Sequence, residues 1–168
     1  MINVALYGLG RIGQMHGENL FKHPKFNLKY VFDTDNKLAL KSANKFKAIA
    51  INDYKIALKD KNVDVIFIAS STATHIKFIR EAAEYKKTIF CEKPLDLDLK
   101  KIVNCSKYIK KFSPRIQIGF NRRYDPGHSS LKKKLLQGVI GKLEKIIITS
   151  RDPSPPPLSY LKRSGGIF

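Results

Sequence analysis

Short apolar runs rich in β-branched residues alternate regularly with amphipathic stretches, and this alternation constrains the fold of the 168-residue chain more than any other feature. The amphipathic stretches, such as 36–47 and 74–85, repeat apolar side chains three and four positions apart, as helices packed on a sheet do. The runs are nearly continuous, which is typical of strands buried on both faces of a parallel sheet. They occupy residues 2–7, 28–33, 63–69, 88–93 and 115–120, with 48–51 as a further short candidate. The alternation predicts an α/β fold with a Rossmann-type doubly wound parallel sheet.

The pattern changes after Phe120. Residues 121–127 (NRRYDPG) fit a polar turn, 129–138 a short helix ended by Gly138, and 142–150 (KLEKIIITS) a strand with partial alternation. A proline-rich run follows, which by itself is most often a linker. We therefore expect a Rossmann domain over residues 1–120 and the start of an incomplete α+β domain over 121–168.

The net charge of +18 bears on possible partners. A basic face attracts phosphates without regard to base sequence, so a nucleic-acid-binding protein with a Rossmann-like core is one alternative. The lysines, however, are spread over the whole chain, and tracts such as 131–136 (LKKKLL) fit solvated helix faces. We expect a lysine-rich surface and no specific nucleic acid partner.

Two features bear on the cellular compartment, namely the lack of a membrane span or signal peptide and the positions of the cysteines. No apolar run approaches the ~20 residues of a membrane span, and the N-terminus fits a strand better than a signal peptide. Cys91 and Cys105 fall in a predicted strand and a predicted helix, which is typical of buried thiols and not of a disulfide or metal site. These features predict a reduced, cytoplasmic protein without a membrane or metal partner.

A glycine-spaced turn, GLGRIG (8–13), directly follows the first predicted strand and precedes an amphipathic helix. In such a turn the first glycine permits the turn, the second lets a pyrophosphate approach, and the third lets the helix pack closely on the strand. The N–H groups at the start of the helix then face the phosphates. The turn predicts a dinucleotide site formed by Gly8, Gly10, Arg11, Ile12 and Gly13.

Asp33 stands twenty residues after Gly13, at the end of the second predicted strand. A carboxylate there accepts hydrogen bonds from the ribose hydroxyls of an adenosine and repels a 2′-phosphate, which favours NAD over NADP. The alternative is that Asp33 is a turn or helix-capping residue, although Asp35 and Asn36 could cap equally well.

The strand at 63–69 ends in SSTATH (70–75). Short hydroxyl side chains at the carboxyl edge of such a sheet line the crevice where a dinucleotide lies. The sequence therefore predicts cofactor contacts from Ser70, Ser71, Thr72 and His75. For His75 an alternative is nearly as good, in which Thr74 is a helix N-cap and His75 lies in the first turn.

The next strand ends in CEKP (91–94), and this segment resembles the EKP signature of the Gfo/Idh/MocA oxidoreductase family. The likeness continues through further segments and covers essentially the whole chain, and their order is most similar to the inositol 2-dehydrogenase branch. The segments are YGLGRIGQMH (7–16), VFDTD (31–35), GFNRRYDP (119–126), GVIGKLEKI (138–146), SRDPSPPP (150–157) and SGGIF (164–168).

The resemblance implies an NAD-dependent dehydrogenase that transfers a hydride between the nicotinamide and a secondary alcohol of a sugar or cyclitol. Lys93 matches the family's catalytic lysine, with Glu92 beside the cofactor and a cis bond before Pro94. An ammonium at this position hydrogen-bonds the reacting hydroxyl and stabilises its developing charge. In a chain so rich in lysine, the alternative is an ordinary surface charge.

The segments after Phe120 carry further family expectations. Asn121 is expected beside the cofactor, with Arg122 and Asp152 at the substrate. In the family, an aspartate and a histidine that complete the catalytic set follow SGGIF, as does a sheet that forms the oligomer interface. This chain ends at Phe168, so we expect an N-terminal fragment of a homo-oligomeric enzyme, catalytically incomplete alone. A non-catalytic NAD-binding or regulatory module is the remaining alternative.

Overall fold

A computed structural model of the protein describes residues 1–151, 154, 155 and 158. The chain divides into two units, Met1–Gly119 and Phe120–Phe168, and each is described by itself. Within the described residues, no helix combines the length and the apolar character that crossing a membrane requires.

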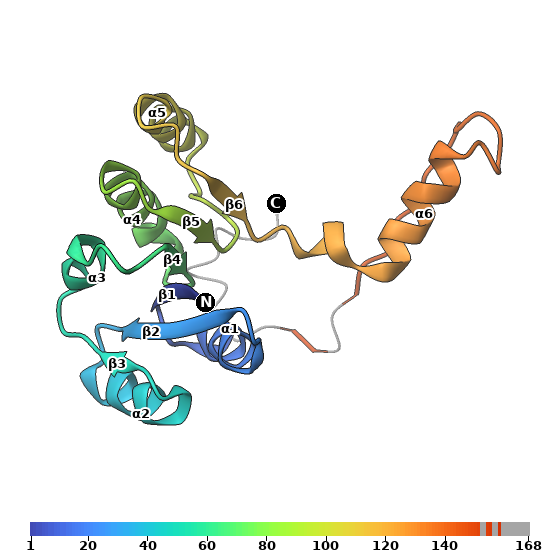
Figure 1. Cartoon of the computed structure of the whole chain (residues 1–168). Coiled ribbons are helices and arrows are strands. Elements are labelled where there is room, and N and C mark those ends of the chain that lie inside the picture. Colours follow the sequence, from blue (N-terminus) through green and yellow to red (C-terminus); the bar gives the residue numbers. More distant parts are fainter. Residues whose placement is uncertain (152–153, 156–157, 159–168) are drawn as a thin grey trace. The chain divides into compact units, whose positions relative to one another are not determined.

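The first unit is built on a six-stranded parallel sheet with the strand order β3-β2-β1-β4-β5-β6 (Figure 1). The chain starts in the middle of the sheet, moves outward to β3, and returns to β4 on the other side of β1, so the order reverses between β1 and β4. This is the doubly wound order of dinucleotide-binding sheets, and it confirms the predicted fold class. The strands are β1 (Ile2–Tyr7), β2 (Phe26–Phe32), β3 (Ile49–Ala50), β4 (Val65–Ile68), β5 (Thr88–Cys91) and β6 (Ile116–Ile118).

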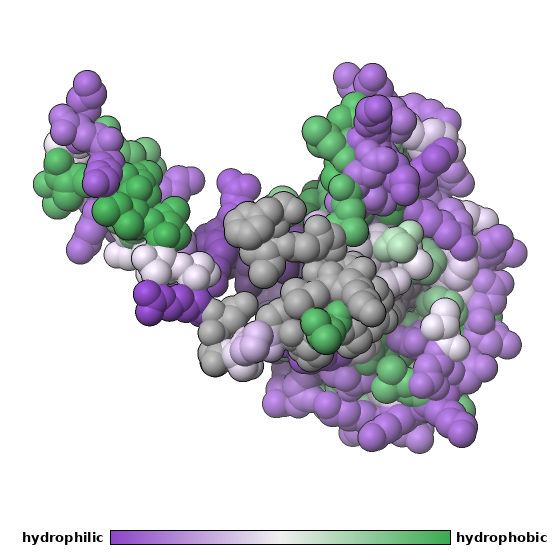
Figure 2. Space-filling view, turned by 180° about the vertical axis from the view of Figure 1, so that it is seen from behind, coloured by the Kyte–Doolittle hydropathy of each residue, from purple (hydrophilic) through white to green (hydrophobic). Residues whose placement is uncertain are grey.

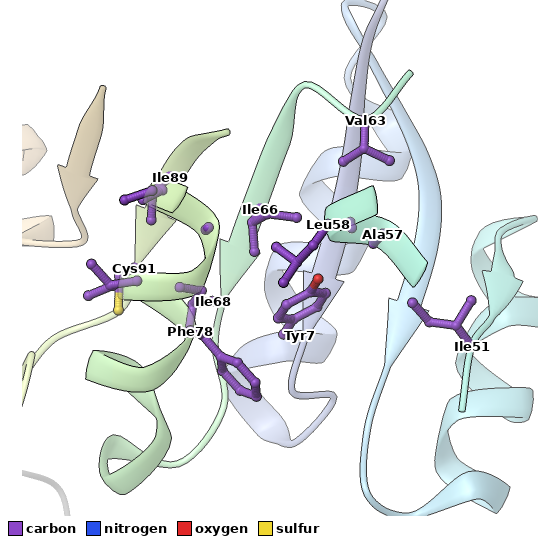
Figure 3. Packing of buried hydrophobic residues seen from close by; sticks show 14 of the residues in the cluster. Tyr7, Ile51, Ala57, Leu58, Val63, Ile66, Ile68, Phe78, Ile89 and Cys91 are labelled. Carbon is purple, nitrogen blue, oxygen red and sulfur yellow. The ribbon is translucent and has the colours of Figure 1, made fainter. Parts of the chain in front are cut away.

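Helices cover both faces of this sheet, and they are α1 (Arg11–Lys22), α2 (Asn36–Phe46), α3 (Lys55–Lys59), α4 (Thr72–Glu84) and α5 (Leu99–Lys110). Successive side chains of a strand point to opposite faces, so β1 contributes to two cores. Val4 and Leu6 pack with α1 and α2. Ala5 and Tyr7 pack with α3, α4 and α5, and Figure 3 shows Tyr7 beside Leu58 and Phe78 on this face.

The cysteines lie in the second of these cores, and both are buried free thiols, as predicted. Burial raises the pKa of Cys91 to about 12, and it also raises the pKa of Cys105. Burial thus favours the protonated thiol at both positions.

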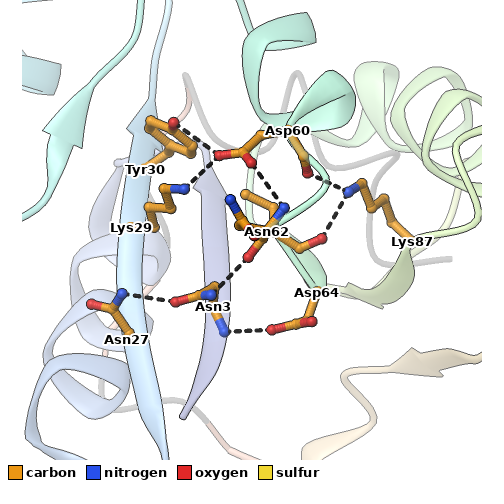
Figure 4. Close-up of polar contacts among 9 residues, drawn as sticks. Asn3, Asn27, Lys29, Tyr30, Asp60, Asn62, Asp64 and Lys87 are labelled. Carbon is orange, nitrogen blue, oxygen red and sulfur yellow. Dashed lines mark hydrogen bonds and ion pairs between the residues drawn. The ribbon is translucent and has the colours of Figure 1, made fainter.

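A polar network joins the amino ends of the strands, at the edge of the sheet opposite the carboxyl ends (Figure 4). The Asp60 carboxylate accepts hydrogen bonds from the Lys29 ammonium at 2.6 Å and the Tyr30 hydroxyl at 3.0 Å. The buried Lys87 ammonium donates to the carbonyl oxygens of Asp60 and Val63. The turn before β4 is thereby linked to β2 and β5.

The second unit contains η1 (Asn121–Tyr124) and α6 (Pro126–Leu136). The Asp125 carboxylate caps α6 by accepting from the His128 N–H, and Gly138 follows the helix end as predicted. The strand predicted over 142–150 is wrong, because these residues form neither strand nor helix. A strand needs a neighbour for its backbone groups, and the described residues of this unit supply none.

Figure 2 shows a largely hydrophilic surface over the first unit and an apolar face on α6. The hydrophilic surface agrees with the predicted solvated lysines. In the second unit, the exposed apolar side chains include Leu131, Leu136, Ile147 and Ile148.

Candidate active site

The glycine turn between β1 and α1 brings backbone groups together at two of its three glycines. Gly8 has a φ of +88°, and a Cβ there would lie 2.4 Å from the Cα of Ser70. A Cβ on Gly13 would lie 2.0 Å from the Gly8 carbonyl oxygen, whereas a Cβ on Gly10 would meet no atom within 4 Å. The first and third glycines therefore close the turn, and Gly10 borders open space of the kind that a pyrophosphate needs.

Two helices begin at the point where the strand order reverses, and neither has a side-chain cap. These are α1, which follows Gly10, and α4, which follows Ser71. Aspartate carboxylates cap the starts of α2, α5 and α6 instead. The first-turn N–H groups of α1, including those of Arg11 and Ile12, have no acceptor within the helix, so they can receive an anion.

Asp33 lies half-buried after β2 and contacts the glycine turn. One carboxylate oxygen accepts from the Leu9 N–H at 2.7 Å, and the other accepts from the Asp35 N–H at 3.0 Å. Asp35, not Asp33, caps α2, with bonds to the N–H groups of Lys37 and Leu38. Asp33 is thus a turn residue, and its oxygens still have lone pairs for ribose hydroxyls.

The SSTATH segment forms the start of α4. Ser71 is the N-cap residue and is exposed, so the alternative with Thr74 as the cap is wrong. The Thr74 hydroxyl donates to the Ser71 carbonyl, so the Ser70 hydroxyl must donate to Thr74 in their 2.7 Å contact. Thr72 is half-buried in the first turn of α4.

His75 differs from these neighbours because it is 1% exposed. Its Nδ1 lies 2.8 Å from the Pro94 carbonyl oxygen, and its Nε2 lies 3.0 Å from the Ser70 carbonyl oxygen. Both ring nitrogens therefore face backbone carbonyl oxygens inside the protein. His75 thus links two strand ends, and the cofactor contact that the sequence predicts for it stays a prediction.

Lys93 lies at the carboxyl end of β5 and is exposed, and the Lys93–Pro94 bond is cis, as the resemblance implies. The Glu92 carboxylate beside it is half-buried, and it meets His16 Nε2 at 2.7 Å and the Lys93 N–H at 3.2 Å. In the sheet, β4 lies between β1 and β5. The glycine turn follows β1, the SSTATH segment follows β4 and Lys93 follows β5, so all three lie at the carboxyl edge of the sheet.

Two predicted residues, Asn121 and Arg122, lie exposed in η1, in the second unit. Arg122 lines a hollow of about 550 Å³ together with Arg123, His128 and Lys132, all from that unit. Asp152 lies outside the described residues. The roles of these three residues stay predictions.

The sequence reasoning missed His16, Gly17 and Gly119. His16 lies among the buried positions 13, 17 and 20 of α1, and a polar residue on that face was the available signal. A Cβ on Gly17 would lie 2.5 Å from the Phe46 ring, so Gly17 lets α1 approach α2. A Cβ on Gly119 would lie 3.0 Å from a Glu92 oxygen, so Gly119 leaves room for that carboxylate.

Comparison with known proteins places this site in a family. Residues 2–120 match the Gfo/Idh/MocA model, described as an oxidoreductase family with an NAD-binding Rossmann fold. The chain is 39% identical to the myo-inositol 2-dehydrogenase of Thermotoga maritima, over 99% of the chain and 50% of that protein.

Two solved structures share the fold. A putative myo-inositol dehydrogenase from Sinorhizobium meliloti superposes with a TM-score of 0.92 at 35% identity, covering 99% of this chain and 50% of that one. A scyllo-inositol dehydrogenase from Lactobacillus casei, solved with NAD(H) and scyllo-inositol, gives 0.79 at 26% identity, covering 84% and 42%. The chain spans about half the length of the curated relatives it matches. With residues 2–120 matching its model, the chain belongs to the Gfo/Idh/MocA family of NAD-binding oxidoreductases.

Proposed function

We propose that this protein is an NAD-dependent oxidoreductase that transfers a hydride between the nicotinamide and a secondary alcohol of a cyclitol resembling myo-inositol. One observation carries the proposal: three features lie at the same edge of the sheet. They are the open space at Gly10, the Asp33 carboxylate and the exposed Lys93. The names of the related inositol dehydrogenases support the cyclitol class.

The residues after β1 and β2 fit a dinucleotide. In the proposed complex, the N–H groups at the start of α1 bind the pyrophosphate, Gly10 lets it approach, and Asp33 accepts from the adenosine ribose. Bound NAD supplies the hydride acceptor for alcohol oxidation. Ser70, Ser71 and Thr72 are proposed to contact the same dinucleotide, and Asn121 is proposed to contact the cofactor from the second unit.

Lys93 is the proposed catalytic residue. Its ammonium donates a hydrogen bond to the reacting hydroxyl and stabilises the negative charge that grows on that oxygen as the hydroxyl proton leaves, before the hydride passes to the nicotinamide. It also helps to move the hydroxyl proton toward solvent. Arg122 and Asp152 are proposed to bind other hydroxyl groups of the substrate.

Cofactor binding is tested by calorimetric titration of the 168-residue chain with NADH. Gly10→Val adds a side chain where the protein has no atom within 4 Å, so the variant is expected to keep its unfolding midpoint. It should weaken NADH binding by at least about tenfold, because the branched side chain fills the approach to the helix start. Unchanged affinity in a folded Gly10→Val variant would refute this cofactor site.

Catalysis is tested in an extended protein, in which the chain is followed by the C-terminal half of the Thermotoga maritima relative. We expect NADH formation from myo-inositol, and Lys93→Met should lower kcat by roughly 10² to 10⁴ with little change in the Kd of NADH. An extended protein that binds NADH but oxidises no cyclitol would favour a non-catalytic NAD-binding module.

A further inference from the structure

Two buried or half-buried imidazoles, from two different helices, contact the segment Glu92–Lys93–Pro94. His16 comes from α1, the helix of the glycine turn, and His75 comes from α4, the helix after β4. One contacts the segment just before Lys93 and the other just after it. Lys93 itself is exposed between them.

The first contact joins α1 to the backbone of Lys93 through one carboxylate. Glu92 Oε1 accepts from His16 Nε2 at 2.7 Å, and Glu92 Oε2 accepts from the Lys93 N–H at 3.2 Å. A carboxylate only accepts, so the hydrogen of the first bond belongs to His16 Nε2.

The surroundings of His16 restrict where its ring can lie. The His16 ring centroid is 4.7 Å from that of Phe67 and 5.6 Å from that of Phe90, and these two phenyl rings stack at 4.0 Å. The side chains of His16 and Glu92 are each only 17% exposed. Phe67 is on β4 and Phe90 on β5, so the imidazole is packed against the strands that precede the predicted site.

The second contact joins α4 to the segment after Lys93. His75 Nδ1 lies 2.8 Å from the Pro94 carbonyl oxygen, and Nε2 lies 3.0 Å from the Ser70 carbonyl oxygen at the end of β4. A neutral imidazole has one N–H and donates to one of these two carbonyl oxygens, and the ring lies between them at the ends of β4 and β5.

We propose that His16 and His75 are positioning residues, which hold the Glu92–Pro94 segment from both sides and thereby determine where the Lys93 ammonium meets the substrate. The proposal rests on the proposed function of Lys93. It explains why each imidazole faces a backbone or carboxylate oxygen on the same three residues. Reaction rate is sensitive to such placement, because a shift of about 1 Å can cost 10²-fold.

The first test measures geometry without activity. Amide hydrogen exchange at Lys93 is followed by NMR in the ¹⁵N-labelled 168-residue chain, because this N–H bonds the carboxylate that His16 holds. His16→Leu should speed exchange at Lys93 by roughly threefold or more. His16→Gln presents an amide N–H near the position of Nε2 and should stay within about twofold of the unmodified chain. His23→Leu, at the exposed end of α1, is the control and should change nothing at Lys93.

The second test measures turnover in the extended protein. His16→Leu should lower kcat by about 10- to 100-fold with the KM for NAD nearly unchanged, and His16→Gln should restore most of the loss. At His75, the asparagine amide takes the place of Nδ1 and keeps the Pro94 bond, whereas the glutamine amide takes the place of Nε2 and keeps the Ser70 bond. His75→Asn should therefore retain roughly tenfold more kcat than His75→Gln.

The outcomes separate this proposal from the function on which it rests. If Lys93→Met leaves turnover intact, the proposed function of Lys93 fails, whatever the histidine variants do. If Lys93→Met removes turnover but His16→Leu changes neither kcat nor exchange at Lys93, the positioning role is overturned and the proposed function stands. Equal kcat losses in His16→Gln and His16→Leu, at equal unfolding midpoints, would also overturn it.

Discussion

Asp33 shows how one side chain can serve the fold and a ligand at the same time. Its carboxylate accepts from the Leu9 N–H inside the glycine turn, so it orders the loop that the proposed pyrophosphate contacts. From the sequence alone, a role in the turn and a role in binding the ribose were alternatives for Asp33. The geometry makes them compatible, because a carboxylate has about four acceptor positions and the turn uses only some of them.

The charge of Asp33 can be separated from its hydrogen bond to Leu9. Asp33→Asn keeps an oxygen for the Leu9 N–H but removes the negative charge, so repulsion of a 2′-phosphate disappears. We expect the preference for NADH over NADPH to narrow by roughly tenfold, which is ~1.4 kcal/mol. Calorimetric titration with both cofactors measures this ratio, and Asp35→Asn, which changes the α2 cap, is the control. A wild-type chain that binds NADPH as tightly as NADH would contradict the role given to Asp33.

At the scale of elements, two features of α1 determine how it packs, namely the spacing of its apolar residues and Gly17. The apolar spacing that predicted the helix explains why it packs, but Gly17 explains how closely, because the Phe46 ring of α2 occupies the space of a side chain at that position. Glycines inside helices normally destabilise them by roughly 1 kcal/mol, so Gly17 looks unfavourable until its neighbour is known. That neighbour is distant in sequence, and periodicity within one helix cannot reveal it.

The network at the amino ends of the strands makes the free energy of unfolding depend on pH. Hydrogen bonds from the Lys29 ammonium and the Asn62 N–H lower the pKa of Asp60 to about 2. The unfolded value is about 3.9. A carboxyl whose pKa is lower in the folded state stabilises the fold above its unfolded pKa, and this stabilisation is lost as the pH falls through the folded pKa.

We therefore expect the stabilisation from Asp60 to be complete near pH 6 and to disappear between about pH 4 and pH 2. Asp60→Asn should be less stable than the unmodified chain at pH 6, and the difference should shrink toward pH 2. Lys29→Met should shrink the acid-dependent part as well, since it removes the largest cause of the shift. Urea unfolding at several pH values measures the difference. A constant gap between Asp60→Asn and the unmodified chain from pH 6 to pH 2 would rule out this account.

At the scale of the whole molecule, the sequence predicted the doubly wound parallel sheet and most element positions, because alternating runs and turns are local signals. The resemblance directed attention to Lys93, but His16 and the inward direction of His75 depend on contacts between helices and strand ends that lie far apart in the chain. The strand predicted over 142–150 failed for a related reason. Alternation indicates that a segment suits a sheet, yet only a neighbouring strand makes it one.

Net charge is also a property of the whole molecule. The value of +18 would suit a nucleic-acid partner if the basic side chains gathered on one surface. In the sequence they are spread over both units, and several are engaged within the fold, as Lys29 and Lys87 are. A spread charge attracts any polyanion weakly and selects none.

We therefore expect duplex DNA to bind no more tightly than about 10⁻⁶ M near 150 mM salt, with affinity that falls steeply as salt rises. NADH affinity should change far less over the same salt range, because a dinucleotide presents only a single pyrophosphate and its ribose and backbone contacts are short-ranged. Gly10→Val separates the two activities, since it should weaken NADH binding and leave DNA binding unaltered. Fluorescence titrations at two salt concentrations, with DNA added as competitor, measure both. Tight DNA binding that displaces NADH would instead favour the nucleic-acid-binding alternative, because a shared site would then explain both the basic charge and the glycine turn.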